Sequence, residues 1–171
     1  CKWSDISIFS FHPVKIITTF EGGVATTNNK SIYPEINELK KIFISIKNYK
    51  PNLIIAVGGG SVIDYAKIVN CINEIEGIEK KIINSNYKLK KSKCSLLAIP
   101  TTAGSGAEVT SNAVIYVKKK KYSIEGKLVK PDFYLLIPSL ILKGNKKLKA
   151  SAGFDAIAQS LESIISRKSN N

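Results

Sequence analysis

Residues 53–57 form a continuous apolar run, LIIAV, that is followed at once by three glycines and then by a helical pattern. An apolar run of this length without alternation is expected for a strand that is covered on both faces of a parallel sheet. A second run of the same kind, SLLAI at residues 95–99, is closed by Pro100. Two such strands with helical patterns between and around them predict an α/β fold in which helices cross between parallel strands.

Hydrophobic spacing and turn residues predict the remaining elements. We expect a strand at 14–20, a helix at 33–49, a helix at about 62–75, strands at 112–117 and 133–137 with a basic turn region between them, and a helix at 147–166. The small-residue segment 101–111 is expected to be a loop, and the lysine-rich segment 76–94 a connector. Pro34 suits the first turn of its helix, and Ser61 is expected to cap the helix that follows the glycines.

Composition excludes several classes of protein. No stretch approaches the ~20 apolar residues of a membrane span, and the first residues lack the pattern of a signal peptide. The net charge of +13 comes from lysines that are spread along the chain with few aromatic neighbours, so we expect no nucleic-acid partner. The three cysteines are widely separated, which indicates neither a zinc cluster nor a disulfide framework and favours the cytoplasm.

The glycines, together with Ser61, form a segment that we call the glycine loop (residues 58–61). Glycines let a backbone approach a ligand closely, and the first N–H groups of the following helix favour an anion such as phosphate. Ser61 can cap the helix or offer its hydroxyl to a phosphate, and Asp64 is expected on the first helical turn. The alternative is a tight strand–helix turn without a ligand, because neither a GxGxxG nor a Walker pattern is present.

A second loop of small residues, which we call the threonine loop (residues 101–106, TTAGSG), follows the second apolar strand. In a parallel sheet both loops emerge at the carboxyl edge, where α/β proteins bind their ligands. The pair therefore predicts a cleft for a phosphorylated cofactor, either a nucleotide or a dinucleotide.

Three segments together, IAVGGGSVIDYAK, AIPTTAGSGAEVT and AGFDAIAQSLES, resemble the iron-containing (group III) alcohol dehydrogenase family. Their order and intervals match, whereas dehydroquinate-synthase-like proteins share only the first loop. The resemblance implies a Rossmann-like, mostly parallel sheet in residues 1–146 that binds a dinucleotide. It also implies that residues 147–171 begin an all-helical, metal-binding domain.

The resemblance assigns roles to residues of the glycine loop and of the helix after it. Gly59, Gly60 and Ser61 are expected to hold the pyrophosphate of NAD or NADP. Asp64 is expected to reach toward the nicotinamide.

Four further positions match residues that line the family's cofactor site. Thr101, Thr102 and Ser105 belong to the threonine loop. Lys121 lies ten residues before Pro131, as the family's cofactor-contacting lysine does before its next proline. The alternative for Lys121 is a solvated member of a run of lysines.

The family's metal is held by an aspartate and by histidines, and Asp155 matches that aspartate. The expected metal is a divalent ion, iron first and zinc second. The alternative for Asp155 is an ordinary first-turn carboxylate. Gln159 stands where the common pattern has a histidine, and an amide is a weaker ligand than imidazole. Three explanations remain open: fewer protein ligands, as in glycerol dehydrogenase relatives, another substrate, as in the phosphonoacetaldehyde-reductase-like branch, or loss of the metal.

The resemblance implies an oxidoreductase that moves a hydride between NAD(P) and a small alcohol or aldehyde, with the metal polarising the substrate oxygen. The parent enzyme is expected to be a homo-oligomer, and no residue here is assigned as catalytic base. The family's first strand and its later histidines would lie outside the chain. We therefore expect a fragment that binds cofactor weakly and has no turnover alone. The alternative is a nucleotide-binding domain without redox activity.

Overall fold

The computed structural model describes residues 7–10, 24–27, 36–90, 94–142 and 146–166. Their elements, in chain order, are β1 (Ser7–Ser10), β2 (Val24–Thr27), α1 (Ile36–Tyr49), β3 (Leu53–Gly58), α2 (Gly60–Cys71), α3 (Ile78–Ile83), β4 (Ser95–Pro100), β5 (Asn112–Val117), β6 (Lys120–Glu125), the 3-10 turn η1 (Lys127–Val129), β7 (Phe133–Tyr134), α4 (Pro138–Leu142) and α5 (Lys146–Ile165).

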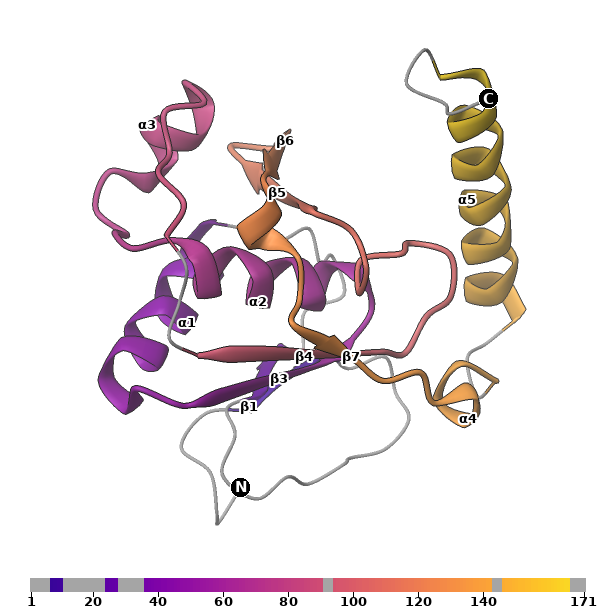
Figure 1. The fold of residues 1–171 in the computed structure, drawn as a ribbon, viewed down its shortest axis with the longest axis horizontal. Helices are drawn as coiled ribbons and strands as arrows, with labels where there is room; N and C mark the ends of the chain where they lie inside the picture. Colours follow the sequence, from indigo (N-terminus) through magenta and orange to yellow (C-terminus); the bar gives the residue numbers. More distant parts are fainter. Residues whose placement is uncertain (1–6, 11–23, 28–35, 91–93, 143–145, 167–171) are drawn as a thin grey trace.

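A five-stranded parallel sheet in the order β2-β1-β3-β4-β7 forms the base of the fold (Figure 1). The sheet confirms the predicted α/β class. From β1 the chain pairs β2 on one side and then crosses through α1 to pair β3 on the other side. Such a reversal of strand order is where open α/β sheets bind ligands, outside the carboxyl ends of the strands. The glycine loop leaves β3 at this point.

Helix α2 lies between two layers, with the sheet on one side and the β5–β6 hairpin on the other (Figure 1). Ile63 and Ala66 belong to a buried cluster with residues of β3 and β4. Val62, Ile68 and Val69 belong to a second cluster with α1, α3 and the hairpin. A helix that is covered on both sides is apolar around most of its circumference, and this explains the run VIDYAKIVNC.

The hairpin and α3 differ from the predictions. The segment after β5 was expected to be a basic turn region, but β6 pairs antiparallel with β5 from Asn112↔Glu125 to Val117↔Lys120. Its turn is Lys118-Lys119, with both residues at positive φ (50° and 63°). Ile124 is fully buried against the second cluster, so one apolar residue anchors a strand whose other residues are mostly exposed.

The segment 76–94 was expected to be a lysine-rich connector, and no helix was predicted in it, but it contains α3. Ile78 and Ile82 are buried at helical spacing, and Gly77 precedes them in the left-handed conformation with φ 64°. Two buried isoleucines four residues apart are enough to dock one and a half turns of helix between lysines that remain in water.

The other predicted elements compare as follows. Strands 53–57, 95–99 and 112–117 are confirmed as β3, β4 and β5, and the helix at 147–166 as α5. The helix at 33–49 is described from Ile36 as α1, while Pro34 and the strand at 14–20 lie outside the described residues. The helix at 62–75 is shorter than predicted and ends at Cys71, and the strand at 133–137 is reduced to Phe133–Tyr134.

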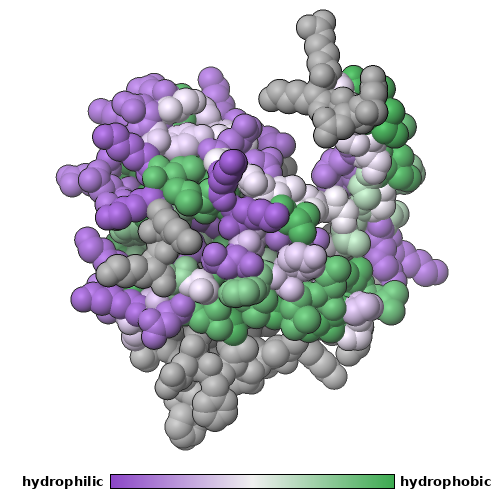
Figure 2. All heavy atoms as spheres, in the orientation of Figure 1, coloured by the Kyte–Doolittle hydropathy of each residue, from purple (hydrophilic) through white to green (hydrophobic). Residues whose placement is uncertain are grey.

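Apolar side chains are exposed over two regions, around β7 and α4 and along α5, where Figure 2 shows them in green. They are Phe133, Tyr134, Leu135, Leu136 and Leu142 in the first region, and Phe154, Ile157, Leu161, Ile164 and Ile165 in the second. Within the described part of the chain, no helix combines the length and the apolarity that crossing a membrane requires.

The two-sided packing of α2 makes a prediction about stability. Ile63 is fully buried between α2 and the sheet, whereas Ile83, at the end of α3, is 40% exposed. Ile63→Ala should lower the free energy of unfolding by about 2–5 kcal/mol, because it removes buried methyl groups and leaves a cavity. Ile83→Ala is the matched control and should cost roughly 1 kcal/mol or less. Urea denaturation of both variants measures this, and equal losses would contradict the packing of α2.

Candidate functional site

The glycine loop turns directly from β3 into α2. Gly58 is in register with Pro100 of β4, and the Thr101 N–H donates to the Gly58 carbonyl at 2.9 Å. A Cβ on Gly58 would lie 2.7 Å from the Cβ of Val62, so only glycine fits where the strand meets the first turn of the helix. The turn from β3 into α2 therefore requires glycine at position 58.

The threonine loop lies against the glycine loop, as the parallel sheet predicts. A Cβ on Gly59 would come 3.3 Å from Thr102 Oγ1, and a Cβ on Gly60 would come 3.0 Å from Ser105 Oγ. Two hydroxyl groups thus face two positions without side chains, at the N-terminus of α2. Thr101, Thr102 and Ser105 are all partly exposed. This arrangement suits a phosphate, which accepts hydrogen bonds from hydroxyl and backbone N–H groups.

Two details of the predicted loop are wrong. Ser61 does not cap α2, because the N-cap is Gly59 in an extended conformation and no side chain caps the helix. The Val62 and Ile63 N–H groups donate instead to the Gly59 carbonyl, at 3.0 and 3.2 Å. Asp64 does not lie on the first turn. Ser61 is consequently inside the helix, where its partly exposed hydroxyl is not committed to capping.

The Asp64 carboxylate is held between two layers. Its Oδ2 accepts a hydrogen bond of 3.0 Å from the Val114 N–H of β5, and its Oδ1 lies 3.5 Å from the Nζ of Lys67. The side chain of Asp64 is 14% exposed. Asp64 therefore ties α2 to the hairpin, a role that the sequence did not predict.

Lys67 is a residue that sequence analysis missed. It is 1% exposed, yet its ammonium group has three acceptors: Asn112 O at 2.7 Å, Thr110 Oγ1 at 3.0 Å and Asp64 Oδ1 at 3.5 Å. An ammonium group carries three N–H donors, so each donor has an acceptor within reach. Lys67 joins α2 to the segment that leads from the threonine loop into β5.

Burial dominates the electrostatics of this pair. Desolvation raises the pKa of the Asp64 carboxyl, although the Val114 N–H and the charge of Lys67 act to lower it. Desolvation likewise lowers the pKa of Lys67, although the charges of Asp64 and Glu108 act to raise it. Asp64 and Lys67 thus each stabilise the charged form of the other, because water has little access to either group.

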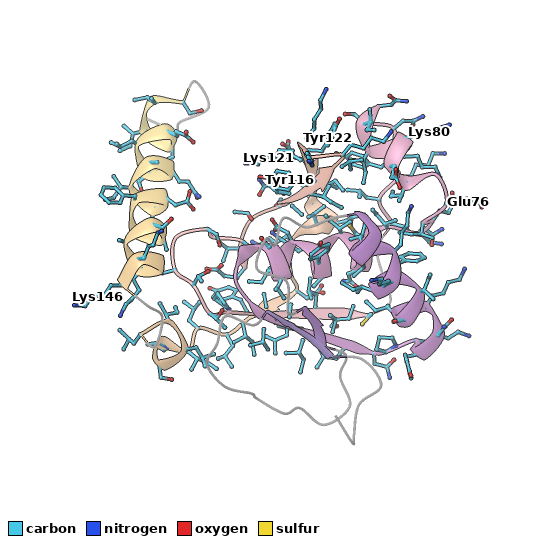
Figure 3. The ribbon with its side chains drawn as sticks, turned by 180° about the vertical axis from the view of Figure 1, so that it is seen from behind. Glu76, Lys80, Tyr116, Lys121, Tyr122 and Lys146 are labelled. Carbon is cyan, nitrogen blue, oxygen red and sulfur yellow. The ribbon has the colours of Figure 1, made fainter. Side chains whose placement is uncertain are left out.

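Lys121 lies in β6, opposite Tyr116 of β5, and its side chain is exposed. Figure 3 shows it on the hairpin near Tyr116 and Tyr122. Burial raises the pKa of Asp64, and the positive charge of Lys121 acts against that rise. The hairpin thus brings Lys121 into electrostatic range of the helix that starts at the glycine loop.

Helix α5 approaches the threonine loop at one point. Gly104 has a φ of 106°, and a Cβ there would collide with the backbone carbonyl of Ala152. Asp155, one turn further along α5, is exposed, and its Oδ2 accepts a hydrogen bond of 2.9 Å from the Gln159 amide. Gln159 therefore contacts Asp155 directly.

The described residues do not by themselves form a metal centre. Among them no group of three His, Cys, Asp or Glu side chains is close enough to hold an ion. Asp155 is exposed and hydrogen-bonded to Gln159 instead of to a second ligand-type residue. Burial raises the pKa of Cys71 to about 12 and that of Cys94 to about 11, so both thiols stay protonated and are poor ligands.

The parallel sheet, the reversal of strand order at β1 and β3 and the paired loops above it define a Rossmann-like α/β domain. The profile of the iron-containing alcohol dehydrogenase family matches residues 15–138, which is more than half of the chain. The chain belongs to this family.

Individual relatives agree. An alcohol dehydrogenase of Thermococcus barophilus is 33% identical over 135 residues, covering 75% of this chain and 36% of that protein. A 1-propanol dehydrogenase of Citrobacter freundii is 31% identical over 140 residues, covering 81% and 34%. The crystal structure of a sulfoacetaldehyde reductase from Bifidobacterium kashiwanohense in complex with NAD+ superposes with a TM-score of 0.75 at 26% identity, covering 86% and 39%. The chain thus spans well under half the length of these relatives.

The requirement for glycine at position 58 leads to a testable prediction. Gly58→Ala should lower the free energy of unfolding by about 1–3 kcal/mol, because the new methyl group overlaps the side chain of Val62. Gly153→Ala is the matched control: Gly153 lies inside α5 with nothing within 4 Å of a Cβ, so the change should stabilise the chain by about 0.5–1 kcal/mol. Thermal unfolding of both variants measures the contrast, and two changes of the same sign would contradict the geometry of the glycine loop.

Proposed function

We propose that the chain binds NAD or NADP between the glycine loop and the threonine loop. The observation that carries the proposal is the close approach of the two loops at the N-terminus of α2, where Gly59 faces Thr102 and Gly60 faces Ser105. A Cβ at either glycine would crowd the facing hydroxyl group, at 3.3 Å from Thr102 and 3.0 Å from Ser105. The match of residues 15–138 to the family and the NAD+ complex of a structural relative support the choice of a nicotinamide dinucleotide.

The roles of the residues follow from their places in the fold. Gly59, Gly60 and Ser61 hold the pyrophosphate, because the first N–H groups of α2 have no acceptor within the helix and the helix dipole favours an anion there. The partly exposed hydroxyl of Ser61 adds a donor.

The other assigned residues complete the site. Thr101, Thr102 and Ser105 line the opposite wall with hydroxyl groups. Lys121 contributes positive charge from the hairpin. We assign Asp64 to the nicotinamide side of the site, and its contact with Val114 of β5 holds its carboxylate in place.

For the whole protein we propose hydride transfer between the bound nicotinamide and a small alcohol or aldehyde. Membership of the family and the alcohol dehydrogenases among the relatives support this reaction. The described residues do not make a metal centre, so we derive no step through a metal. In this proposal the chain's own residues bind and orient the dinucleotide, and residues 147–171 begin a second, helical domain. The parent enzyme is a homo-oligomer without a nucleic-acid or membrane partner, and this chain alone binds cofactor without turnover.

The second candidate is a dinucleotide-binding protein without redox activity. The hydrogen bond from Gln159 to Asp155 favours it, since it engages the carboxylate to which the family resemblance assigns the metal. Metal analysis of the full-length protein, together with aldehyde-dependent oxidation of NADH, separates the two candidates. Turnover that disappears in Asp155→Ala supports the dehydrogenase, and cofactor binding without turnover supports the second candidate.

The phosphate site makes a prediction that separates binding from folding. Ser61→Asp places a negative charge on the first turn of α2, where the helix dipole should stabilise it by about 0.3–1 kcal/mol. The same charge would repel a pyrophosphate, so the affinity for NADH should fall at least about tenfold. Fluorescence titration with NADH, with thermal unfolding of the same samples, measures both effects.

The matched control is Ser139→Asp, which places the same charge on the first turn of α4. Ser139 is exposed, and the control should leave NADH affinity unchanged. Undiminished NADH binding by Ser61→Asp would rule out the proposed position of the pyrophosphate. Equal weakening by both variants would indicate a nonspecific effect of charge.

A further inference from the structure

The buried ammonium group of Lys67 has no place in the cofactor contacts assigned above. Its three acceptors are Asn112 O, Thr110 Oγ1 and Asp64 Oδ1. Burying an ammonium group is costly, and an apolar side chain of similar length would fill the same volume without that cost. The contacts of Lys67 therefore call for an explanation beyond the packing of α2.

Two of the three acceptors lie just beyond the threonine loop. Between that loop and β5 the chain makes a tight turn, in which the Val109 and Thr110 N–H groups donate to the Gly106 carbonyl at 3.0 and 3.1 Å. Gly106 has a φ of 60°, which favours glycine. The turn thus links Thr110, which Lys67 holds, to the end of the threonine loop.

The turn at residues 106–110 is directly connected to Ser105 of the threonine loop. The Ala107 N–H donates to Ser105 Oγ at 3.4 Å, and Ser105 is the residue that faces Gly60. Only four residues lie between Ser105 and Thr110, and the turn that they form is closed by its own hydrogen bonds. A displacement of Thr110 would therefore also displace Ser105.

Lys67 and the glycine loop are carried by the same helix. Lys67 follows Ser61 by six residues, a rise of about 9 Å along α2. The helix is buried on both sides, so its N-terminus and Lys67 move together as one rigid element. The N-terminus of α2 forms one side of the proposed dinucleotide site, and the threonine loop on the other side is connected to α2 through the turn that Lys67 contacts.

We propose that Lys67 is a positioning residue of the dinucleotide site, which sets the distance between the two loops by holding Thr110 and Asn112 against α2. This inference rests on the proposed cofactor site. It assigns to Lys67 no contact with the cofactor. Its effect on binding passes through Thr110 and the turn at residues 106–110.

The test uses Thr110→Val and Lys67→Met, alone and together. Thr110→Val removes the hydroxyl that Lys67 contacts and keeps the methyl group that lies near Gly106. Lys67→Met removes the ammonium group and keeps an unbranched side chain. Lys81→Met is the control, because Lys81 makes an exposed ion pair with Glu74 at 2.8 Å. Each protein is titrated with NADH, and its amide hydrogen exchange is measured without cofactor.

Thr110→Val should weaken NADH binding about threefold to tenfold, and Lys67→Met more than that, whereas Lys81→Met should have no effect. In the double variant the Thr110→Val change should add little to Lys67→Met, since both remove the same interaction. Exchange should accelerate at the amides of Val109 and Thr110 in both variants, while the amides of β3 and β4 keep their protection.

Unchanged exchange at residues 106–111 in Thr110→Val would overturn the proposal, as would additive losses of affinity in the double variant. If Lys67→Met does not fold, Thr110→Val alone decides by the same criteria. If the unaltered chain does not bind NADH, the proposed function fails. The exchange comparison, which needs no cofactor, then still decides whether Lys67 positions the loop.

Discussion

The arrangement of α2, the threonine loop and the hairpin depends on the contacts of the buried Lys67 ammonium group. It is nearly inaccessible to water, so its charge has to be compensated by the Asp64 carboxylate, the Thr110 hydroxyl and the Asn112 carbonyl. These acceptors come from α2 itself and from the segment that enters the hairpin. These contacts add to the apolar packing of the hairpin on α2, and Asp64 strengthens the connection by accepting a hydrogen bond from Val114. A helix between two layers, with its N-terminus open at the sheet edge, is the result.

The parts of the fold that the sequence predicts well are those in which local pattern and burial agree. The runs at 53–57 and 95–99 are apolar without interruption because β3 and β4 lie in the middle of the sheet. Their common direction brings the glycine and threonine loops together, so the meeting of Gly60 with Ser105 follows from sequence once the strands are parallel. The roles of these residues toward a cofactor remain predictions.

The sequence predicts β6, α3 and the start of α2 poorly, and for different reasons. The hairpin strand and α3 are docked by one and two buried apolar residues among many lysines, too few to give a clear periodicity. Ser61 was expected as the cap because serine is a common cap, yet the backbone of Gly59 already takes the cap conformation. The sequence did not indicate the burial of Lys67, because Asp64 and Asn70 lie three residues before and after it on α2 and form a short polar stripe, which is usually exposed to water.

The threonine loop lies between α2 and α5 and contacts both helices. Lys67 contacts Thr110 in the turn that follows the loop. The Ala152 carbonyl of α5 packs against Gly104 within the loop, where a positive φ and the lack of space both require glycine. Helix α5 also carries Asp155 and Gln159. The threonine loop therefore contacts α2 at Gly60 through Ser105 and α5 at Ala152 through Gly104. The threonine loop and α5 are therefore in backbone contact at Gly104, and a side chain at this position would separate them.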